Sequence, residues 1–267
     1  MASLKTTVRT LLLFLIPRYP FINAVTLLLL LAERARREKY PPMDPNMIYG
    51  HLIMFVVCGV CMSFNFRRKD AALVHSGQLI YFALSVYNND KLGYSRWLRT
   101  RMALKMIGVA GITVLYAFYS MRKPRSLPLK RMAESIVGII LGALMYMVLE
   151  SDEDRTAFTT LMPGGNISLY AYTLILGGSA LCFLPGWYVY DVAVFLVPAL
   201  IFPCIFVDCH INYWTHKRGV DFWNQIRLMS DGMYLISGVV MMLVCSVKKL
   251  PVSEAELRRQ EEREHAD

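Results

Sequence analysis

Apolar residues in this chain are gathered into long continuous runs that short polar segments separate. A helix that crosses a bilayer needs about 20 mostly apolar residues, and eight runs approach or exceed that length. Because the runs are continuous and do not alternate with polar residues, they predict helices and not strands. They cover residues 11–31, 47–66, 71–87, 102–121, 132–149, 167–184, 187–207 and 233–247. The last run is short, so we expect its helix to begin nearer Met229.

The pattern predicts an all-α fold, a polytopic membrane helix bundle of about eight transmembrane helices with short loops. A single transmembrane domain would cover residues 1–250, followed by a charged tail, 251–267, that we expect to be solvated. Within the tail, Ser253 and Glu256 have the spacing of a helix capping box. We also expect an acidic loop at residues 150–154 and a half-buried cap over the bundle at residues 220–227.

Composition supports this fold and narrows the partners. The chain is 55% hydrophobic and only 18% charged, with a formal net charge of +9. In a membrane protein such a basic excess flanks the spans, so the expected partner is a lipid bilayer with anionic headgroups. A nucleic-acid partner is not predicted, because it would need a basic face on a soluble domain.

Eight spans place both termini on one side of the membrane. That side would carry fifteen Lys and Arg residues, against thirteen on the other side, with Arg18 left out of both counts. Basic residues favour the cytosol, so both termini are predicted to be cytosolic. The opposite side would carry Asn166, which begins a glycosylation sequon.

Arg18 is an ionisable residue inside the first apolar run, between Pro17 and Pro20. One interpretation is a charge buried in the bundle at a broken helix, which would mark a functional site. The other is that the run is two pieces, an interfacial segment ending at Pro17 and a span starting near Pro20. In that case Arg18 would extend to the headgroups, which avoids most of the cost of burial.

Asp191 follows the Pro185-Gly186 turn and lies near the start of the seventh run. It either sits at the membrane surface or faces the bundle, where it would pair with a base or bind a cation. Pro198 and Pro203 are expected to kink this helix, and such kinks can line a cavity or simply pack.

Several short segments stand out together, in this order along the chain: Ala32-Glu33-Arg34-Ala35, Met62-Ser63-Phe64, Arg122-Lys123-Pro124-Arg125-Ser126, Glu153-Asp154-Arg155 with Pro163-Gly164-Gly165, and Tyr213-Trp214 with Phe222-Trp223-Asn224-Gln225. Their order and spacing resemble the transmembrane protein 101 family of animals. Asp208 matches an acidic position of that pattern, whereas Asp191 does not match it. The resemblance implies a polytopic protein with no established catalytic site and a role in activating NF-kappa-B signalling.

Two hypotheses for function follow. The first is a non-enzymatic membrane protein that acts through other membrane or signalling proteins. The second is a small-solute transporter or channel that uses proline-broken helices and the charges of Arg18, Asp191 and Asp208. No catalytic set, cofactor or metal is predicted, because the His and Cys residues near Asp208 match no closed zinc spacing.

Overall fold

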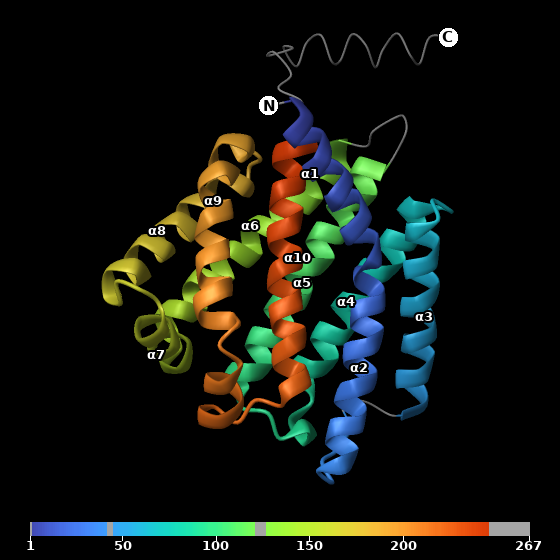
Figure 1. Cartoon of the computed structure of the whole chain (residues 1–267), viewed down its shortest axis with the longest axis vertical. Coiled ribbons are helices and arrows are strands. Elements are labelled where there is room, and N and C mark those ends of the chain that lie inside the picture. The colour runs from blue at the N-terminus through green and yellow to red at the C-terminus, as the bar shows by residue number, and fades with distance from the viewer. Residues whose placement is uncertain (1, 42–44, 121–126, 246–267) are drawn as a thin grey trace.

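The computed structural model describes residues 2–41, 45–120 and 127–245, and over these ranges the chain is helical without strands (Figure 1). The predicted tail and its capping box lie outside the described residues. The α-helices are α1 (Ala2–Leu15), α2 (Tyr19–Arg36), α3 (Pro45–Ser63), α4 (Arg68–Asn88), α5 (Arg96–Ser120), α6 (Leu127–Glu150), α7 (Asp152–Leu161), α8 (Asn166–Phe183), α9 (Val189–Pro203) and α10 (Phe222–Cys245). Short 3-10 or π-helical turns join them: η1 (Ile16–Arg18), η2 (Asp90–Leu92), η3 (Cys204–Asp208) and η4 (Tyr213–Lys217).

The prediction of an all-α polytopic bundle is confirmed. Within the described ranges, seven helical segments are long and apolar enough to cross a membrane. α4, which corresponds to the third predicted span, is also long enough at 21 residues. It is less apolar because His75, Ser76 and Gln78 are among its buried residues, so it does not belong to the seven. The seven candidate spans of the described residues are consistent with the prediction of about eight.

The first apolar run forms one continuous helical segment. Thr6–Arg36, 31 residues long, passes through a single 3-10 turn, η1, at Pro17 and Arg18. Prolines at the first positions of η1 and α2 are compatible with this geometry, because the first residues of a helix need no amide donor. The regular helix is interrupted at Pro17 and Arg18, where the sequence predicted a break, and α2 begins at Tyr19; where the membrane surface lies along this segment stays a prediction.

Two segments differ from the sequence prediction. Residues 150–154, expected as an acidic loop, end α6 and begin α7, and the Ser151 hydroxyl accepts a hydrogen bond from the Asp154 amide at 3.3 Å. α10 begins at Phe222, well before Met229, so residues 220–227 are largely the start of a span and not a cap. Polar residues do not end this helix because several of them bind partners inside the bundle. Asn224, for example, donates to the Tyr94 hydroxyl, and Gln225 donates to the Asp208 carbonyl.

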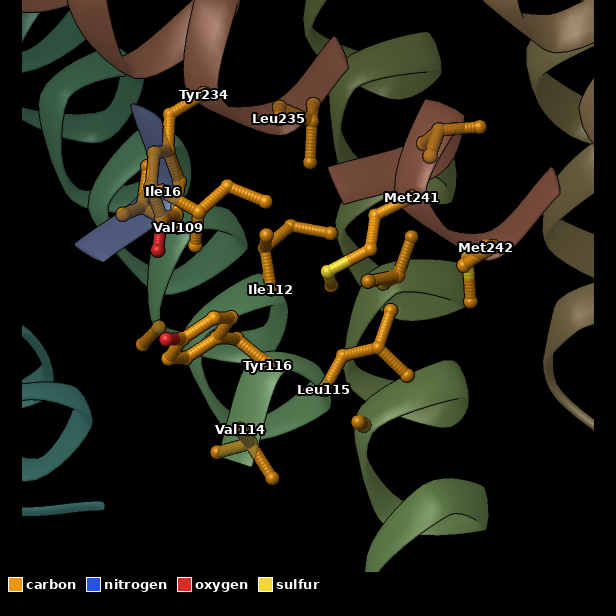
Figure 2. Packing of buried hydrophobic residues seen from close by; sticks show 14 of the residues in the cluster. Ile16, Val109, Ile112, Val114, Leu115, Tyr116, Tyr234, Leu235, Met241 and Met242 are labelled. Atoms are coloured by element: carbon orange, nitrogen blue, oxygen red, sulfur yellow. The ribbon is translucent and has the colours of Figure 1, made fainter. Parts of the chain in front are cut away.

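α5 is the centre of the bundle. It is the most buried of the seven candidate spans, with 78% of its apolar window inside the protein. Figure 2 shows Ile112 and Leu115 of α5 facing Leu235 and Met241 of α10. A Cβ at Gly238 of α10 would overlap the Ile112 side chain, so glycine permits this close approach. Without a hydrophobic driving force in lipid, such packing is a main source of helix association.

The two ends of the bundle differ in their elements. α1 begins and α10 ends at one end, which we call the terminal end (Figure 1). The opposite end, called the distal end, holds the end of α2, the short helix α7 and the start of α10 (Figure 1). Asn166 is exposed at the start of α8, close in sequence to α7.

Candidate functional site

Three side chains on one face of α5 define a polar site at the distal end. Trp97, Arg101 and Lys105 are spaced by four residues, which places them one above another along the helix. Arg101 and Lys105 are about nine-tenths buried, with side-chain exposures of 6% and 11%. Charges this far from water are expensive unless they are paired.

Asp208, at the end of η3, supplies the main partner for both cations. Its carboxylate is 2.5 Å from Arg101 Nη2 and 2.6 Å from Lys105 Nζ. Lys105 Nζ also donates to the Leu228 carbonyl of α10 at 3.2 Å, and Gln225 Nε2 donates to the Asp208 carbonyl at 2.7 Å. Asp208 therefore joins α5, η3 and α10.

Asp154 of α7 completes the group, which we call the charged network: Trp97, Arg101, Lys105, Asp154 and Asp208. Asp154 Oδ1 lies 3.3 Å from Arg101 Nη1, and its Oδ2 accepts a hydrogen bond from Trp97 Nε1 at 2.7 Å. Burial raises the pKa of Asp154 above its usual range, although Arg101 and Trp97 stabilise the charged form. Two cations and two carboxylates give the network no formal net charge.

Aromatic rings hold the arginine from the other side. The Trp97 and Trp214 rings are stacked with centroids 5.6 Å apart, and the Arg101 guanidinium lies 4.1 Å from the Trp214 centroid. Trp214 is fully buried in η4, and its Nε1 donates to the Val207 carbonyl at 2.8 Å. A guanidinium fixed by rings and carboxylates keeps its orientation, which suits recognition of a planar anionic group.

A cavity of about 80 Å³ adjoins the charged network. Residues of α5, α6, α7, α8, α9, η3 and α10 line it, so it lies where most of the spans meet. Arg101, Lys105, Asp154 and Asp208 form its charged wall, and Tyr172 of α8 contributes a further polar side chain. The volume is enough for several water molecules or for one very small solute.

Not all hydrogen-bonding capacity on the charged wall is used. Arg101 Nη1 is buried and makes no hydrogen bond, although it is within ion-pair distance of Asp154. Asp154 Oδ1 is engaged by that ion pair alone, whereas its other oxygen is bound by Trp97. Arg101 and Asp154 therefore form a close ion pair within the charged wall of the cavity, and Arg101 Nη1 has no hydrogen bond beside it.

The helix that delivers Asp208 is irregular. Pro198 and Pro203 lie inside α9, and the chain continues directly into the π-helical turn η3. Prolines remove helix hydrogen bonds, and π-helical turns are frequent at functional sites. Pro203 and Cys204, where α9 passes into η3, line the cavity, whereas Pro198 is not among its lining residues.

A second group of charges fastens α2 to the start of α10. Asp221 is 3.0 Å from Arg34 and 2.8 Å from Lys39. Arg34 also donates to the carbonyl of Leu92 at 2.8 Å. The Glu33 carboxylate accepts the first amides of α10, at 3.2 and 3.1 Å, as anionic groups at a helix N-terminus do.

The residues singled out in the Phe-Trp-Asn-Gln segment occupy this junction. Phe222 and Trp223 give their amides to Glu33, and their rings meet edge to face. Asn224 is buried and donates to the Tyr94 hydroxyl at 2.6 Å, while Gln225 reaches the Asp208 carbonyl. They connect the Asp221 group to the charged network.

Tyr213, the neighbour of Trp214 in η4, is also buried. Its hydroxyl accepts hydrogen bonds from Arg218, at 3.3 Å from Nε and 3.2 Å from Nη2. The Tyr213 ring meets the Trp214 ring edge to face, with centroids 5.2 Å apart. This tyrosine therefore supports the position of Trp214. It is not one of the residues that line the cavity.

Arg18 and Asp191 are not part of the site. Arg18 is half-buried at η1, where it donates to the Phe14 carbonyl at 2.5 Å and lies over the Phe14 ring. Asp191 is exposed in the first turn of α9, far along that helix from Asp208. The three charges therefore line no common cavity, and only Asp208 remains in the candidate site.

The sequence analysis did not single out Arg101, Lys105 or Asp154 as site residues. By sequence, Arg101 and Lys105 are two of the thirteen basic residues expected on the side of the membrane opposite to the termini. Their spacing with Trp97 on a single helix face was the signal that could have found them. In the parts of the chain that the structure describes, no group of three or more His, Cys, Asp or Glu side chains is placed to hold a metal ion.

Comparison with known proteins assigns most of the chain. Residues 2–246 match the TMEM101 protein family, and this stretch contains all three described ranges. No solved structure matches the fold.

Proposed function

The chain is a multi-pass membrane protein of the TMEM101 protein family, and we propose that it is a non-enzymatic carrier of a small zwitterionic solute. The observation that carries this proposal is the Arg101–Asp154 ion pair on the cavity wall, in which Arg101 Nη1 makes no hydrogen bond. Arg101 Nη1 can donate to the carboxylate of a solute, and Asp154 Oδ1 can accept from its ammonium group. A zwitterion would replace the ion pair between the two residues without leaving a net charge in the membrane.

The surrounding structure suits this role. Asp208 forms ion pairs with Arg101 and Lys105 inside the protein. The charged groups of the solute therefore need to pair only with Arg101 and Asp154. The interruption of α9 at Pro203 and η3 lies on the cavity wall, where a helix can change its course at low cost. Irregular backbone that lines a cavity is a common feature of transporter binding sites.

The test is uptake of radiolabelled solute by proteoliposomes. Glycine, alanine and γ-aminobutyrate are used as probes of increasing length. We expect uptake of at least one, and we expect Asp154→Asn to reduce it by about tenfold, the effect of losing about 1.4 kcal/mol of binding. Asp152→Asn is the matched control, because Asp152 is on the same helix but is exposed.

Two results would contradict the carrier proposal. One is that vesicles with correctly inserted wild-type protein take up none of the three probes above protein-free vesicles. The other is that Asp154→Asn transports as well as wild type while remaining folded by size-exclusion chromatography.

A role in activating NF-kappa-B signalling is the second candidate, and family membership is the observation that supports it. A cytosolic partner would meet whichever end of the bundle faces the cytosol, and we propose that this is the terminal end. Arg67, just before α4, and Lys69, in the first turn of α4, are exposed at that end. We expect the double substitution Arg67→Glu and Lys69→Glu to lower the response of an NF-kappa-B reporter. We expect Lys91→Glu, at the distal end, to leave the response unchanged. A wild-type chain that produces no response would overturn this candidate.

The proposed orientation rests on the basic residues of the terminal end, which would also meet anionic headgroups. It can be tested in sealed, cytosolic-side-out microsomes with a membrane-impermeant maleimide. In a cysteine-free background, we expect Lys69→Cys to be labelled without detergent and Lys91→Cys only after detergent. The reverse pattern would place both termini on the other side.

A further inference from the structure

A second polar group lies inside the bundle, on the side of α10 that faces α2 and α4. We call it the interior cluster: Tyr19, Asn23, His75, Arg227 and Asp231. Every member is at least nine-tenths buried, with exposures between 0% and 4%. The Tyr19 hydroxyl donates to Asp231 Oδ1, and the Tyr19 ring is 6.3 Å from the His75 ring, centroid to centroid.

Hydrogen bonding in the interior cluster is incomplete. Asn23 Nδ2, both ring nitrogens of His75, and Arg227 Nε are buried without a hydrogen-bond partner among the described residues. Each such group costs about 1–3 kcal/mol, and native proteins keep few of them without a functional reason. Several at one place inside a membrane bundle indicate a site that handles polar species.

Asp231 is the acidic member. Among the described residues, only Tyr19 donates a hydrogen bond to the Asp231 carboxyl group. None of the described Lys, Arg or His side chains has a nitrogen within 4 Å of that carboxyl group. Arg227, one turn earlier on α10, points instead to Met106 Sδ at 3.3 Å and to the Phe82 ring. A carboxylate with so little compensation in an apolar bundle is costly, whereas a neutral carboxylic acid is not.

Polar side chains, which we call the polar row, are spaced from Asp231 toward the distal end, although neither ring nitrogen of His75 has a hydrogen-bond partner among the described residues. Tyr19 and His75 follow Asp231, and Gln78 is the next residue on the same side of α4. Gln78 Nε2 is 3.2 Å from His51 Nδ1 and 3.0 Å from the His51 carbonyl. His51 is half-buried near the start of α3, so the row extends from the interior to a partly exposed imidazole.

The same turn of α10 also forms part of the cavity. Leu228, three residues before Asp231, accepts a hydrogen bond from Lys105. A Cβ at Gly232, the next residue after Asp231, would be 3.4 Å from Asp208 Oδ2 and 3.7 Å from Lys105 Nζ. A shift of this turn that follows a change at Asp231 therefore also moves groups of the charged network.

We propose that Asp231 is a proton-binding site whose occupancy drives the solute carrier. The step is a simple exchange: the carboxylate of Asp231 takes up a proton from the polar row while the carrier is open to one side, and the resulting carboxylic acid releases that proton to the other side after the carrier has reoriented. The coupling to solute rests on the proposed carrier function, but the proton site does not. The titratable and charged groups that face Asp231 are Tyr19 of α2, His75 of α4, Lys105 of α5, Asp208 of η3, and Arg227 and Tyr234 of α10.

The proton site is tested by difference infrared spectroscopy of the full chain in lipid nanodiscs, titrated from acid to alkaline pH. We expect a carboxylic acid band that is absent in Asp231→Asn and shifted in frequency in Tyr19→Phe, which keeps the acid but removes its hydrogen bond. Asp191→Asn is the matched control, because Asp191 is exposed in the first turn of α9. If the titrating carboxyl bands are the same in wild type, Asp231→Asn and Tyr19→Phe, the proposal is wrong.

The coupling is tested with the same proteoliposomes and radiolabelled glycine, alanine and γ-aminobutyrate under an imposed pH gradient. We expect the gradient to accelerate wild-type uptake and to have no effect on Asp231→Asn. Uptake that ignores the gradient in wild type would overturn the coupling and leave the carrier function in place. An Asp231 band in vesicles that take up no probe would overturn the carrier and support the proton site alone.

Discussion

The charged network and the interior cluster lie against the same turn of α10, but they differ in whether their buried charges form ion pairs. In the charged network, Arg101, Lys105, Asp154 and Asp208 each have an oppositely charged partner within 4 Å. In the interior cluster, Arg227 and Asp231 are more deeply buried, and neither has such a partner among the described residues.

This difference predicts which of the two groups contributes more to the free energy of unfolding. Removing one member of a buried ion pair leaves the other charge uncompensated and is strongly destabilising. Replacing a buried charge that has no partner by an apolar side chain of similar size removes a desolvation cost and loses little. Substitutions of the same chemical kind should therefore have opposite effects at the two places.

The largest effect is expected for Arg101→Met. It leaves Asp208 with Lys105 alone and Asp154 without a cation, so we expect a loss of about 3–5 kcal/mol in the free energy of unfolding. The measurement is thermal or steric-trap unfolding in detergent micelles. The control is Arg99→Met on the same helix, whose partner Asp90 is 85% exposed, so its ion pair should contribute less than about 1 kcal/mol. Equal losses for the two variants would refute the structural role of the charged network.

A smaller loss is expected for Trp97→Phe. The substitution keeps an aromatic ring beside Trp214 but removes the indole donor that binds Asp154 Oδ2. A hydrogen bond to a charged group contributes about 1.5–3 kcal/mol, and we expect a loss in that range. Trp187→Phe, at an exposed tryptophan, should change stability little in the same unfolding assay. A neutral Trp97→Phe would mean that Asp154 needs no donor other than Arg101.

The smallest effect, and the most informative sign, is expected for Arg227→Met. Because Arg227 makes no ion pair and contacts Met106 and Phe82, we expect stability to be unchanged or to rise by about 1 kcal/mol. The same unfolding assay applies. A loss of several kcal/mol would show that Asp231 is ionised in the folded protein and depends on Arg227, which would also contradict a neutral, proton-carrying Asp231.

The sequence predicted the helices well because long apolar runs have few alternatives in a membrane. It placed the start of α10 too late, because Asn224, Gln225, Arg227 and Asp231 look like the polar flank of a span. These polar residues lie within the helix because residues distant in sequence bind them: Asn224 forms a hydrogen bond with Tyr94, and Asp231 forms one with Tyr19.

The site was only partly predictable for the same reason. Asp208 stood out from its place in the family pattern, and the structure puts it at the centre of the charged network. Spacing along α5 contains the information that Trp97, Arg101 and Lys105 share a face, but not which helix that face meets. The Arg101–Asp208 pair joins residues 107 positions apart, and no local pattern encodes such a meeting.

The capping of α10 by Glu33 has a consequence for biosynthesis. Ribosomes make α2 before α10, so the first amides of α10 meet their carboxylate only after α3 to α9 have been made. Arg34 and Lys105 likewise meet Asp221 and Asp208 only after the helices between them have been made. Until then these charges have to be solvated by water or lipid headgroups, so the ion pairs of the bundle are completed only when α10 is inserted.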